Sequence, residues 1–194
     1  MTNKEKNSRF EDGYKLAFNT PGKVNWKTVF AHWYPAAMAG HTRAQFYIGT
    51  CYDLGRGISR DITIAFNWYL KAAEKGHMES AYNIGFYFDK GEVVAQNYKT
   101  AFRWYKYAAA LGDMEAQRSM GYFYFYGHGV RKNHKKAVFW YKKAARQGLA
   151  GAMYNLALCY KQGDGVIQSN RWAKFYFEKA AHTGHKAAIS ALKK

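Results

Sequence analysis

Small and apolar residues recur along the chain with the spacing of one helix face. Ala44, Ile48, Gly49 and Tyr52 are four, one and three positions apart, which places them on one stripe of a helix. The pattern returns every 36 residues, as Ser80, Ile84, Gly85 and Phe88, as Ala116, Met120, Gly121 and Tyr124, and as Ala152, Leu156, Ala157 and Tyr160. Because glycine costs roughly 1 kcal/mol inside a helix, the small third residue predicts a closely packed neighbouring helix.

A second helix is predicted after each of these first helices. In the first full repeat it carries Ala65, Phe66, Trp68, Tyr69, Ala72 and Ala73, again with a period near 3.6. A capping residue precedes it and a glycine ends it. The caps are Asn25, Asp61, Asn97, Asn133 and Ser169, and the glycines are Gly40, Gly76, Gly112, Gly148 and Gly184.

A glycine loop reverses the chain between the two helices, as in Gly55-Arg56-Gly57-Ile58. The second repeat reads Gly91-Glu92-Val93-Val94 and lacks the second glycine, so its turn should differ. A fixed period of this length predicts helix–turn–helix units stacked on copies of themselves. We therefore predict an all-α fold, a right-handed α–α superhelix that forms a single solenoid domain over residues 1–194. Its parts are a degenerate capping repeat at 8–43, full repeats at 44–79, 80–115, 116–151 and 152–187, and a C-terminal cap at 188–194.

The repeat resembles a known family. Its order is Ala-x-x-x-Leu-Gly-x-x-Tyr, then Gly-x-Gly-Val, then Ala-x-x-Trp-Tyr-x-Lys-Ala-Ala-x-x-Gly, and the last part stands here as Ala137 to Gly148. This order is similar to the Sel1-like repeat, a variant of the tetratricopeptide repeat, over four units from about Ala44 to His185. The resemblance implies a non-catalytic adaptor that binds a partner protein or peptide in a concave groove. A sharper hypothesis is a bacterial immunity protein that neutralises an acidic toxin.

The resemblance also indicates which residues would line such a groove. In related tetratricopeptide structures the concave face comes from first-helix positions outside the packing stripe. Carried over by register, the predicted groove residues are Phe46, Asp53, Tyr82, Phe86, Asp89, Arg118, Tyr122, Phe125, Tyr154 and Lys161. The alternative is that these aromatic residues pack on one another across the groove.

Charge adds a second candidate surface. The net charge is +17, and no acidic residue stands between Glu115 and Asp164. The predicted basic patch consists of Arg131, Lys132, Lys135, Lys136, Lys142, Lys143 and Arg146. It either solvates an outer face or attracts an acidic protein, a nucleic acid or an anionic surface. Against nucleic acid, the basic residues belong mainly to second helices and the aromatic residues to first helices, whereas a stacking platform needs both together.

The two cysteines bear on the compartment. Cys51 and Cys159 lie 108 residues apart, which is three periods. Neighbouring helices pack roughly 8–10 Å apart, so the pair is expected about 25–30 Å apart, and a disulfide needs Cα atoms within roughly 7 Å. With no apolar run of the ~20 residues that span a bilayer and no signal-like N-terminus, we predict free thiols, a cytoplasmic location and a monomer when unbound.

Little in the sequence points to catalysis. His41, His77 and His185 share one repeat position, so they belong to the repeat frame. Metalloprotease, phosphate-loop and nucleophile-elbow motifs are missing from the sequence. We predict no catalytic residue, no metal site and no cofactor, and hence not an enzyme.

Overall fold

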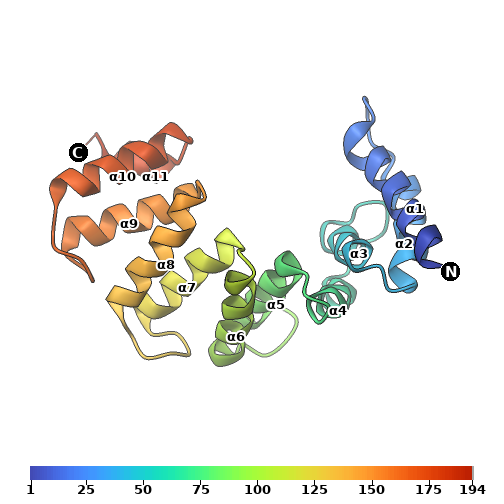
Figure 1. Cartoon of the computed structure of the whole chain (residues 1–194), viewed down its shortest axis with the longest axis horizontal. Helices are drawn as coiled ribbons and strands as arrows, with labels where there is room; N and C mark the ends of the chain where they lie inside the picture. Colours follow the sequence, from blue (N-terminus) through green and yellow to red (C-terminus); the bar gives the residue numbers. More distant parts are fainter. Residues whose placement is uncertain (194) are drawn as a thin grey trace. The chain divides into compact units, whose positions relative to one another are not determined.

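The computed structural model describes residues 1–193, which form eleven α-helices and one π-helical turn and contain no strand. The fold is therefore all-α, as predicted. The helices fall into two compact units, unit 1 at residues 1–96 and unit 2 from Asn97 onward (Figure 1). Each unit is described by itself, and the single domain over 1–194 stays a prediction. Lys194, the end of the predicted C-terminal cap, lies outside the described residues.

Helices come in pairs joined by short loops, as the repeat pattern predicts. Unit 1 contains α1 Asn3–Tyr14, the π-helix η1 Lys15–Asn19, α2 Trp26–Met38, α3 Thr42–Leu54, α4 Ile62–Ala73 and α5 Met78–Lys90. Unit 2 contains α6 Tyr98–Ala110, α7 Met114–Tyr126, α8 His134–Arg146, α9 Ala150–Gln162, α10 Asn170–His182 and α11 Lys186–Ala191. Within the units α3 packs on α4, α7 on α8, and α9 on α10.

The predicted packing stripe is confirmed at three of its four positions. Ala44, Ile48 and Gly49 are buried, and so are their equivalents in the later repeats. At the fourth position Tyr52 is half-buried and packs against the core, and the residue just before it is more deeply buried in each repeat. The buried residues there are Cys51, Tyr87, Phe123 and Cys159. Spacings of four and then three follow the helical period more closely than two spacings of four.

The small residue in the stripe lies against the neighbouring helix, as predicted, and it is an aromatic ring that occupies the space. A Cβ atom built on Gly49 would lie 2.7 Å from Cδ1 of Tyr69, and one built on Gly121 would collide with the Tyr141 ring. Both rings belong to second helices and are almost completely buried. In these two repeats the tyrosine ring of the second helix thus lies where the first helix has no side chain.

The predicted caps of the second helices are confirmed. Asn25, Asp61, Asn97, Asn133 and Ser169 all accept a hydrogen bond from a backbone N–H of the following helix. Three first helices have a histidine cap, which the sequence reading placed in the repeat frame without giving it a role. The Nδ1 atom of His41, His77 and His185 accepts a hydrogen bond from the backbone N–H three residues later. Asp113 takes this role at the start of α7, and Leu149 supplies no side-chain cap to α9.

The two ends and one loop show where the frame varies. The first helix begins at Asn3, earlier than the predicted repeat start at residue 8, because Thr2 and Glu5 form a capping box. The short helix α11, Lys186–Ala191, overlaps the predicted C-terminal cap. Val93 replaces the second loop glycine and has no positive φ, unlike Gly57, so the turn differs there as predicted.

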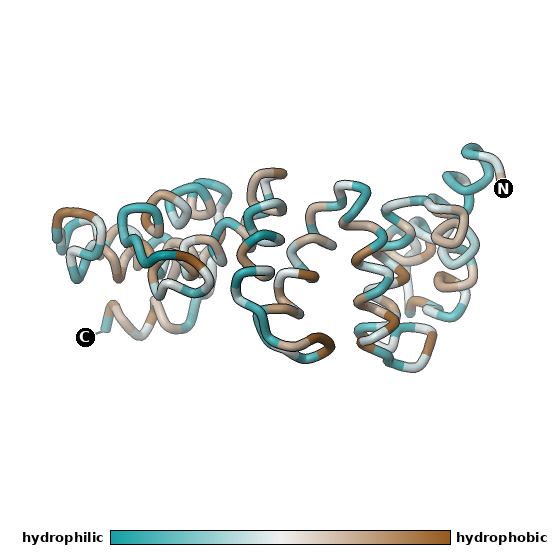
Figure 2. Tube along the Cα trace, turned by 90° about the horizontal axis from the view of Figure 1, so that it is seen from below, coloured by the Kyte–Doolittle hydropathy of each residue, from teal (hydrophilic) through white to brown (hydrophobic). Residues whose placement is uncertain are grey.

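Hydrophilic and hydrophobic residues alternate along the helices, as expected where each helix buries one face (Figure 2). Among the described residues, none of the helices is long and apolar enough to cross a membrane. The cytoplasmic location stays a prediction.

Candidate functional site

A pocket of about 210 Å³ opens beside the buried Tyr141 in unit 2. We call it the tyrosine pocket. The first helices α7 and α9 supply seven of its residues and α8 supplies one; they are Arg118, Tyr122, Phe125, Tyr126, Tyr141, Asn155, Leu158 and Cys159. The pocket therefore brings together three of the predicted groove residues, Arg118, Tyr122 and Phe125.

The floor of the tyrosine pocket is neutral. Burial raises the pKa of the Cys159 thiol to about 12 and also raises the pKa of the Tyr141 phenol. Both groups stay protonated at neutral pH, because the low-polarity surroundings disfavour their anions. A floor of this kind suits an apolar or weakly polar side chain.

The rim of the tyrosine pocket is aromatic and accessible. Tyr122 is 39% exposed and Tyr126 is 56% exposed, and their ring centroids lie 4.5 Å apart. Phe125 stacks on His134 at 4.5 Å, and Nδ1 of His134 lies 3.1 Å from a carboxylate oxygen of Asp164. These contacts fix the wall of the pocket. Arg118 forms an ion pair with Glu115 at 2.9 Å, so its charge is partly compensated.

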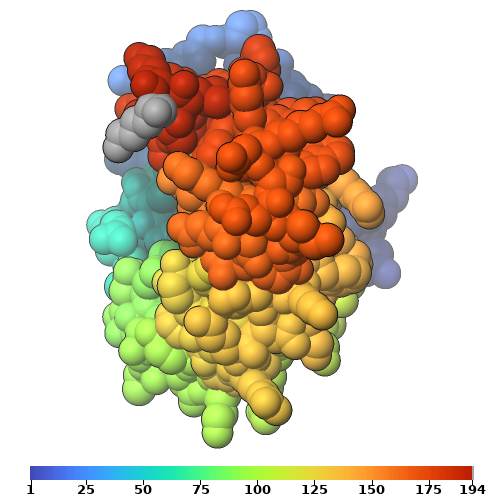
Figure 3. All heavy atoms as spheres, turned by 90° about the vertical axis from the view of Figure 1, so that its left-hand side faces the viewer, coloured from blue at the N-terminus to red at the C-terminus, as the bar shows by residue number. Residues whose placement is uncertain are grey.

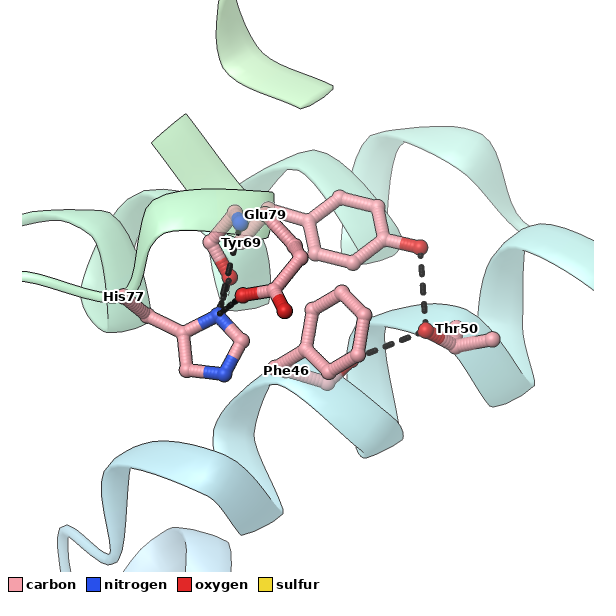
Figure 4. Close-up of polar contacts among 6 residues, drawn as sticks. Phe46, Thr50, Tyr69, His77 and Glu79 are labelled. Atoms are coloured by element: carbon pink, nitrogen blue, oxygen red, sulfur yellow. Dashed lines mark hydrogen bonds and ion pairs between the residues drawn. The ribbon is translucent and has the colours of Figure 1, made fainter. Parts of the chain in front are cut away.

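The equivalent place in unit 1 is built from polar contacts. The Tyr69 hydroxyl donates to Oγ1 of Thr50 at 3.3 Å and to a carboxylate oxygen of Asp53 at 3.4 Å. Thr50 in turn donates to the backbone oxygen of Phe46 (Figure 4). Thr50 and Asp53 stand 72 residues, or two periods, before Tyr122 and Phe125, so the two units differ in chemistry on one backbone pattern.

Two other predicted groove residues pack against the following helix cap. The Phe46 ring stacks on His77 at 4.6 Å, as Figure 4 shows, and the Tyr154 ring stacks on His185 at 4.9 Å. Phe10 and His41 form the same pair in the capping repeat, at 4.5 Å. An aromatic ring that stacks on a capping histidine 31 residues later is thus a recurring structural contact of the repeat.

The remaining predicted groove residues lie outside the tyrosine pocket. Phe86 is half-buried beneath Lys90, whose Nζ lies 5.6 Å from the ring centroid. The backbone oxygen of Asp89 accepts a hydrogen bond from Nε2 of Gln96, and the Asp89 carboxylate lies 4.0 Å from Nζ of Lys90. Tyr82 is half-buried and Lys161 is exposed. Among residues that the predicted site omitted, Tyr126 could have been found as a large aromatic residue at the exposed end of a first helix.

The predicted basic patch is exposed, except for the half-buried Lys142. Its lysines contact aromatic rings: the Lys136 Nζ lies 5.4 Å from the Tyr124 centroid, and the Lys143 Nζ lies 5.2 Å from that of Trp140. The expected separation of basic and aromatic residues is therefore wrong. Lys136 of α8 reaches Tyr124 of the first helix α7, whereas Lys143 and Trp140 both belong to α8, whose own aromatic residues the expectation left out.

Both cysteines are free, as predicted, and both are buried. Burial raises the pKa of Cys51 to about 11, so it is a neutral thiol like Cys159. Within the described residues, no group of three or more His, Cys, Asp and Glu side chains could hold a metal ion.

Comparison with solved structures gives close matches. A Sel1 repeat protein from Oxalobacter formigenes is 32% identical, with a TM-score of 0.91 over 99% of this chain and 78% of that one. A protective antigen of uropathogenic Escherichia coli, described as an SLR fold, is 30% identical, with a TM-score of 0.87 over 95% of this chain. This chain spans only 39% of that antigen.

More distant structures share the fold. One is an immunity protein from Pseudomonas aeruginosa, 22% identical, with a TM-score of 0.62 over 97% of this chain and 69% of that one. The comparison with curated proteins finds no match.

The profile of the Sel1 repeat matches residues 42–77, 79–113, 115–149 and 150–185. The four matches agree with the four full repeats read from the sequence, with boundaries shifted by a few residues. Sel1 repeats form a protein-interaction fold, and proteins built from them are generally non-catalytic scaffolds. This chain belongs to the Sel1 repeat family.

Proposed function

We propose that this chain is a non-catalytic binding protein that recognises a partner protein at the tyrosine pocket of unit 2. The observation that carries the proposal is the accessible pair Tyr122 and Tyr126 above a buried, neutral floor. Tyrosine is enriched among residues that dominate binding energy, because its ring buries a large area at little cost in conformational entropy. At the equivalent place in unit 1, the hydroxyl of the buried tyrosine is hydrogen-bonded to side chains of the first helix, so the place is polar.

The partner we propose is an acidic toxin, and the chain would act as its immunity protein. Charge supports the acidic partner: unit 2 contains 18 Lys and Arg residues and 4 Asp and Glu residues, a net charge of +14. Opposite charge accelerates the encounter of two proteins. The immunity proteins among the structures of the same fold motivate the choice of toxin.

The test begins with a photo-crosslinking amino acid at Tyr126 and, as a control, at Tyr107 of α6, which is 41% exposed and lies outside the pocket. The candidate partner is the protein encoded beside this chain. We expect a crosslink to that protein from position 126 and none from position 107. Equal yields from both positions would contradict a defined site.

Calorimetric titration with the same partner then measures the contribution of the pocket. Replacing Tyr122 and Tyr126 together with alanine should cost at least about 2 kcal/mol of affinity, as truncation of binding hot spots does. The matched control replaces Thr50 and Leu54, the residues two periods earlier in unit 1, and should leave the affinity unchanged. An unchanged affinity in the tyrosine variant would rule out the pocket as the binding site.

A further inference from the structure

A second pocket of unit 2 lies between α8, α9 and α10 and has a volume of about 440 Å³. Three cations line it: Lys142 and Arg146 from α8, and Lys179 from α10. Aromatic rings form its walls, among them Tyr160, Trp172 and Tyr176. We call it the basic–aromatic pocket. No carboxylate lines it, and Lys179 and the α10 aromatic residues belong to neither surface predicted from the sequence.

The basic–aromatic pocket and the tyrosine pocket use opposite faces of α9. Met153 and Tyr160, seven residues apart, lie on one face of that helix and line the basic–aromatic pocket. Asn155 and Leu158 point away from that face and line the tyrosine pocket. The two pockets are therefore separate sites that can be changed independently.

The aromatic wall is ordered by stacking. The rings of Tyr160 and Tyr176 are nearly parallel, with centroids 5.8 Å apart, and Trp172 lies 6.1 Å from Tyr160. Trp172 is 47% exposed and provides an apolar surface at the entrance. Figure 3 looks onto the end of unit 2 where α10, in orange, is exposed beside the amber helix α8.

The cations lie against this wall. The Lys142 Nζ is 5.8 Å from the Tyr160 centroid, and the Lys179 Nζ is 4.9 Å from the Phe175 centroid. Because ammonium groups already cover these rings, a nucleobase would have to displace them in order to stack there. A carboxylate needs no such displacement, because it can pair with the ammonium groups and the Arg146 guanidinium where they stand.

The acidic side chains of unit 2 are used elsewhere. Glu115 pairs with Arg118, Asp164 with His134, and Glu178 with Lys174. Asp113, the fourth, accepts the backbone N–H of Ala116 as a helix cap. Lys142, Arg146 and Lys179 consequently form no ion pair with a carboxylate within the described part of the chain, which leaves the pocket with uncompensated positive charge.

The same pocket recurs in unit 1 with less positive charge. It is lined there by Ala37, Met38, Gln45, Trp68 and Lys71, each three periods before Ala145, Arg146, Met153, Tyr176 and Lys179. Met38 stands in place of Arg146, and Glu74 and Lys75 join the lining, with Nζ of Lys75 donating to the backbone oxygen of Gly40. The repeat frame therefore creates the cavity, and the sequence of unit 2 gives it three cations and no carboxylate.

From these observations we infer that the basic–aromatic pocket binds an acidic peptide segment, in which carboxylates pair with Lys142, Arg146 and Lys179 and a neighbouring apolar side chain rests on Trp172. The inference rests on the proposed function in one respect: the segment belongs to the same acidic partner. It adds a second contact and states its chemistry.

The experiment measures binding of a fluorescein-labelled peptide in which glutamates flank one leucine, at about 0.15 M salt, where long-range attraction is screened. A peptide with glutamine in place of glutamate is the matched probe. The pocket variant combines Lys142→Gln, Arg146→Met and Lys179→Gln, with methionine taken from the equivalent position of unit 1. A charge-matched control combines Arg131→Gln, Lys132→Gln and Lys135→Gln, which lie outside the pocket.

We expect the pocket variant to weaken binding of the glutamate peptide at least about tenfold, the effect of about 1.4 kcal/mol. The charge-matched control should weaken it by less than about threefold, because exposed charges outside the contact act only through a screened field. Equal losses in the two variants, or equal binding of the glutamine peptide, would overturn the inference.

Two further measurements separate the alternatives. A single-stranded oligothymidylate that binds more tightly than the glutamate peptide would make this a nucleic-acid site instead. The variant with Tyr122 and Tyr126 replaced by alanine should bind the peptide as the unchanged protein does. Failure of the peptide assay therefore counts against the basic–aromatic pocket alone, while failure of partner titration counts against the tyrosine pocket.

Discussion

Units 1 and 2 place different chemistry on one repeat frame. In unit 1, the buried Tyr69 donates hydrogen bonds to Thr50 and Asp53. In unit 2, Tyr141 occupies the same frame position, with Tyr122 and Phe125 in place of these acceptors. In unit 2 aromatic rings thus replace the polar partners of the buried tyrosine, and a pocket lies beside it. Positions that carry no packing duty are thus free to change between repeats.

The two units differ in charge in the same way. Unit 1 contains 12 Lys and Arg residues and 9 Asp and Glu residues, a net charge of +3, whereas the net charge of unit 2 is +14. Because the frame is shared, the difference lies in residues outside the buried core. Unit 1 therefore resembles a structural half, and unit 2 carries both proposed contacts.

The largest expected effect tests what the units share. Gly49→Ala and Gly121→Ala each add a methyl group where a tyrosine ring already lies, so each should lower the free energy of unfolding by about 1–3 kcal/mol. Gly151→Ala in α9 is the control, since its nearest neighbour is the flexible Arg118 side chain and alanine favours helix. Urea unfolding measures all three. A stabilised Gly121 variant would contradict the close approach of the Tyr141 ring.

A smaller effect separates the two units. Tyr69→Phe removes a hydroxyl that donates to Thr50 and Asp53, and the loss of such bonds costs about 1–1.5 kcal/mol. Tyr141→Phe should change the free energy of unfolding by less than about 0.5 kcal/mol, because its hydroxyl forms no hydrogen bond within the described residues. If both substitutions lowered the free energy of unfolding equally, the hydrogen bonds of Tyr69 would not stabilise unit 1.

The sequence predicted the repeat frame well, for a physical reason. Helix period, caps such as Asn133 and terminal glycines are local signals, and 36-residue repetition shows each of them several times. At the fourth stripe position the sequence did not distinguish Tyr52 from the more deeply buried Cys51, because both positions fit an apolar helix face when the neighbouring helix is unknown. The sequence reading assigned the histidines to the repeat but did not predict that they cap helices, since imidazole is not among the common capping groups.

The sites were harder to predict, because a pocket depends on neighbours that are distant in sequence. Arg118, Tyr122 and Phe125 were predicted from register, but Asn155 joins them only because α9 packs near α7. The meeting of Lys142 with Tyr160, and of both with Trp172, requires three helices to be placed at once. Periodicity predicts which face of each helix is buried. It does not predict which side chains from different helices come together.

The smallest expected effect concerns pH and falls on unit 1. Burial lowers the pKa of both His41 and His77, and their Nδ1 atoms must be unprotonated in order to accept a backbone N–H. Near His77, Glu79 opposes the shift and Arg43 lowers the pKa further. Near His41, Lys6 lowers the pKa further and Glu11 opposes the shift. An unfolded histidine titrates near about 6.5.

The sign follows from the lowered pKa. As the pH falls below about 6.5, the unfolded chain takes up protons before the folded chain does, so the free energy of unfolding decreases. The stabilisation is complete above that pH and is lost as the pH falls towards the lower pKa values of the folded state, by up to about 1 kcal/mol for each cap.

His77→Asp should remove part of this pH dependence between pH 7 and pH 5, because aspartate can cap a first helix, as Asp113 does for α7. His182→Asn, an exposed position, serves as the control in chemical unfolding at both pH values. If His77→Asp left the pH dependence unchanged, protonation of this cap would not be its cause.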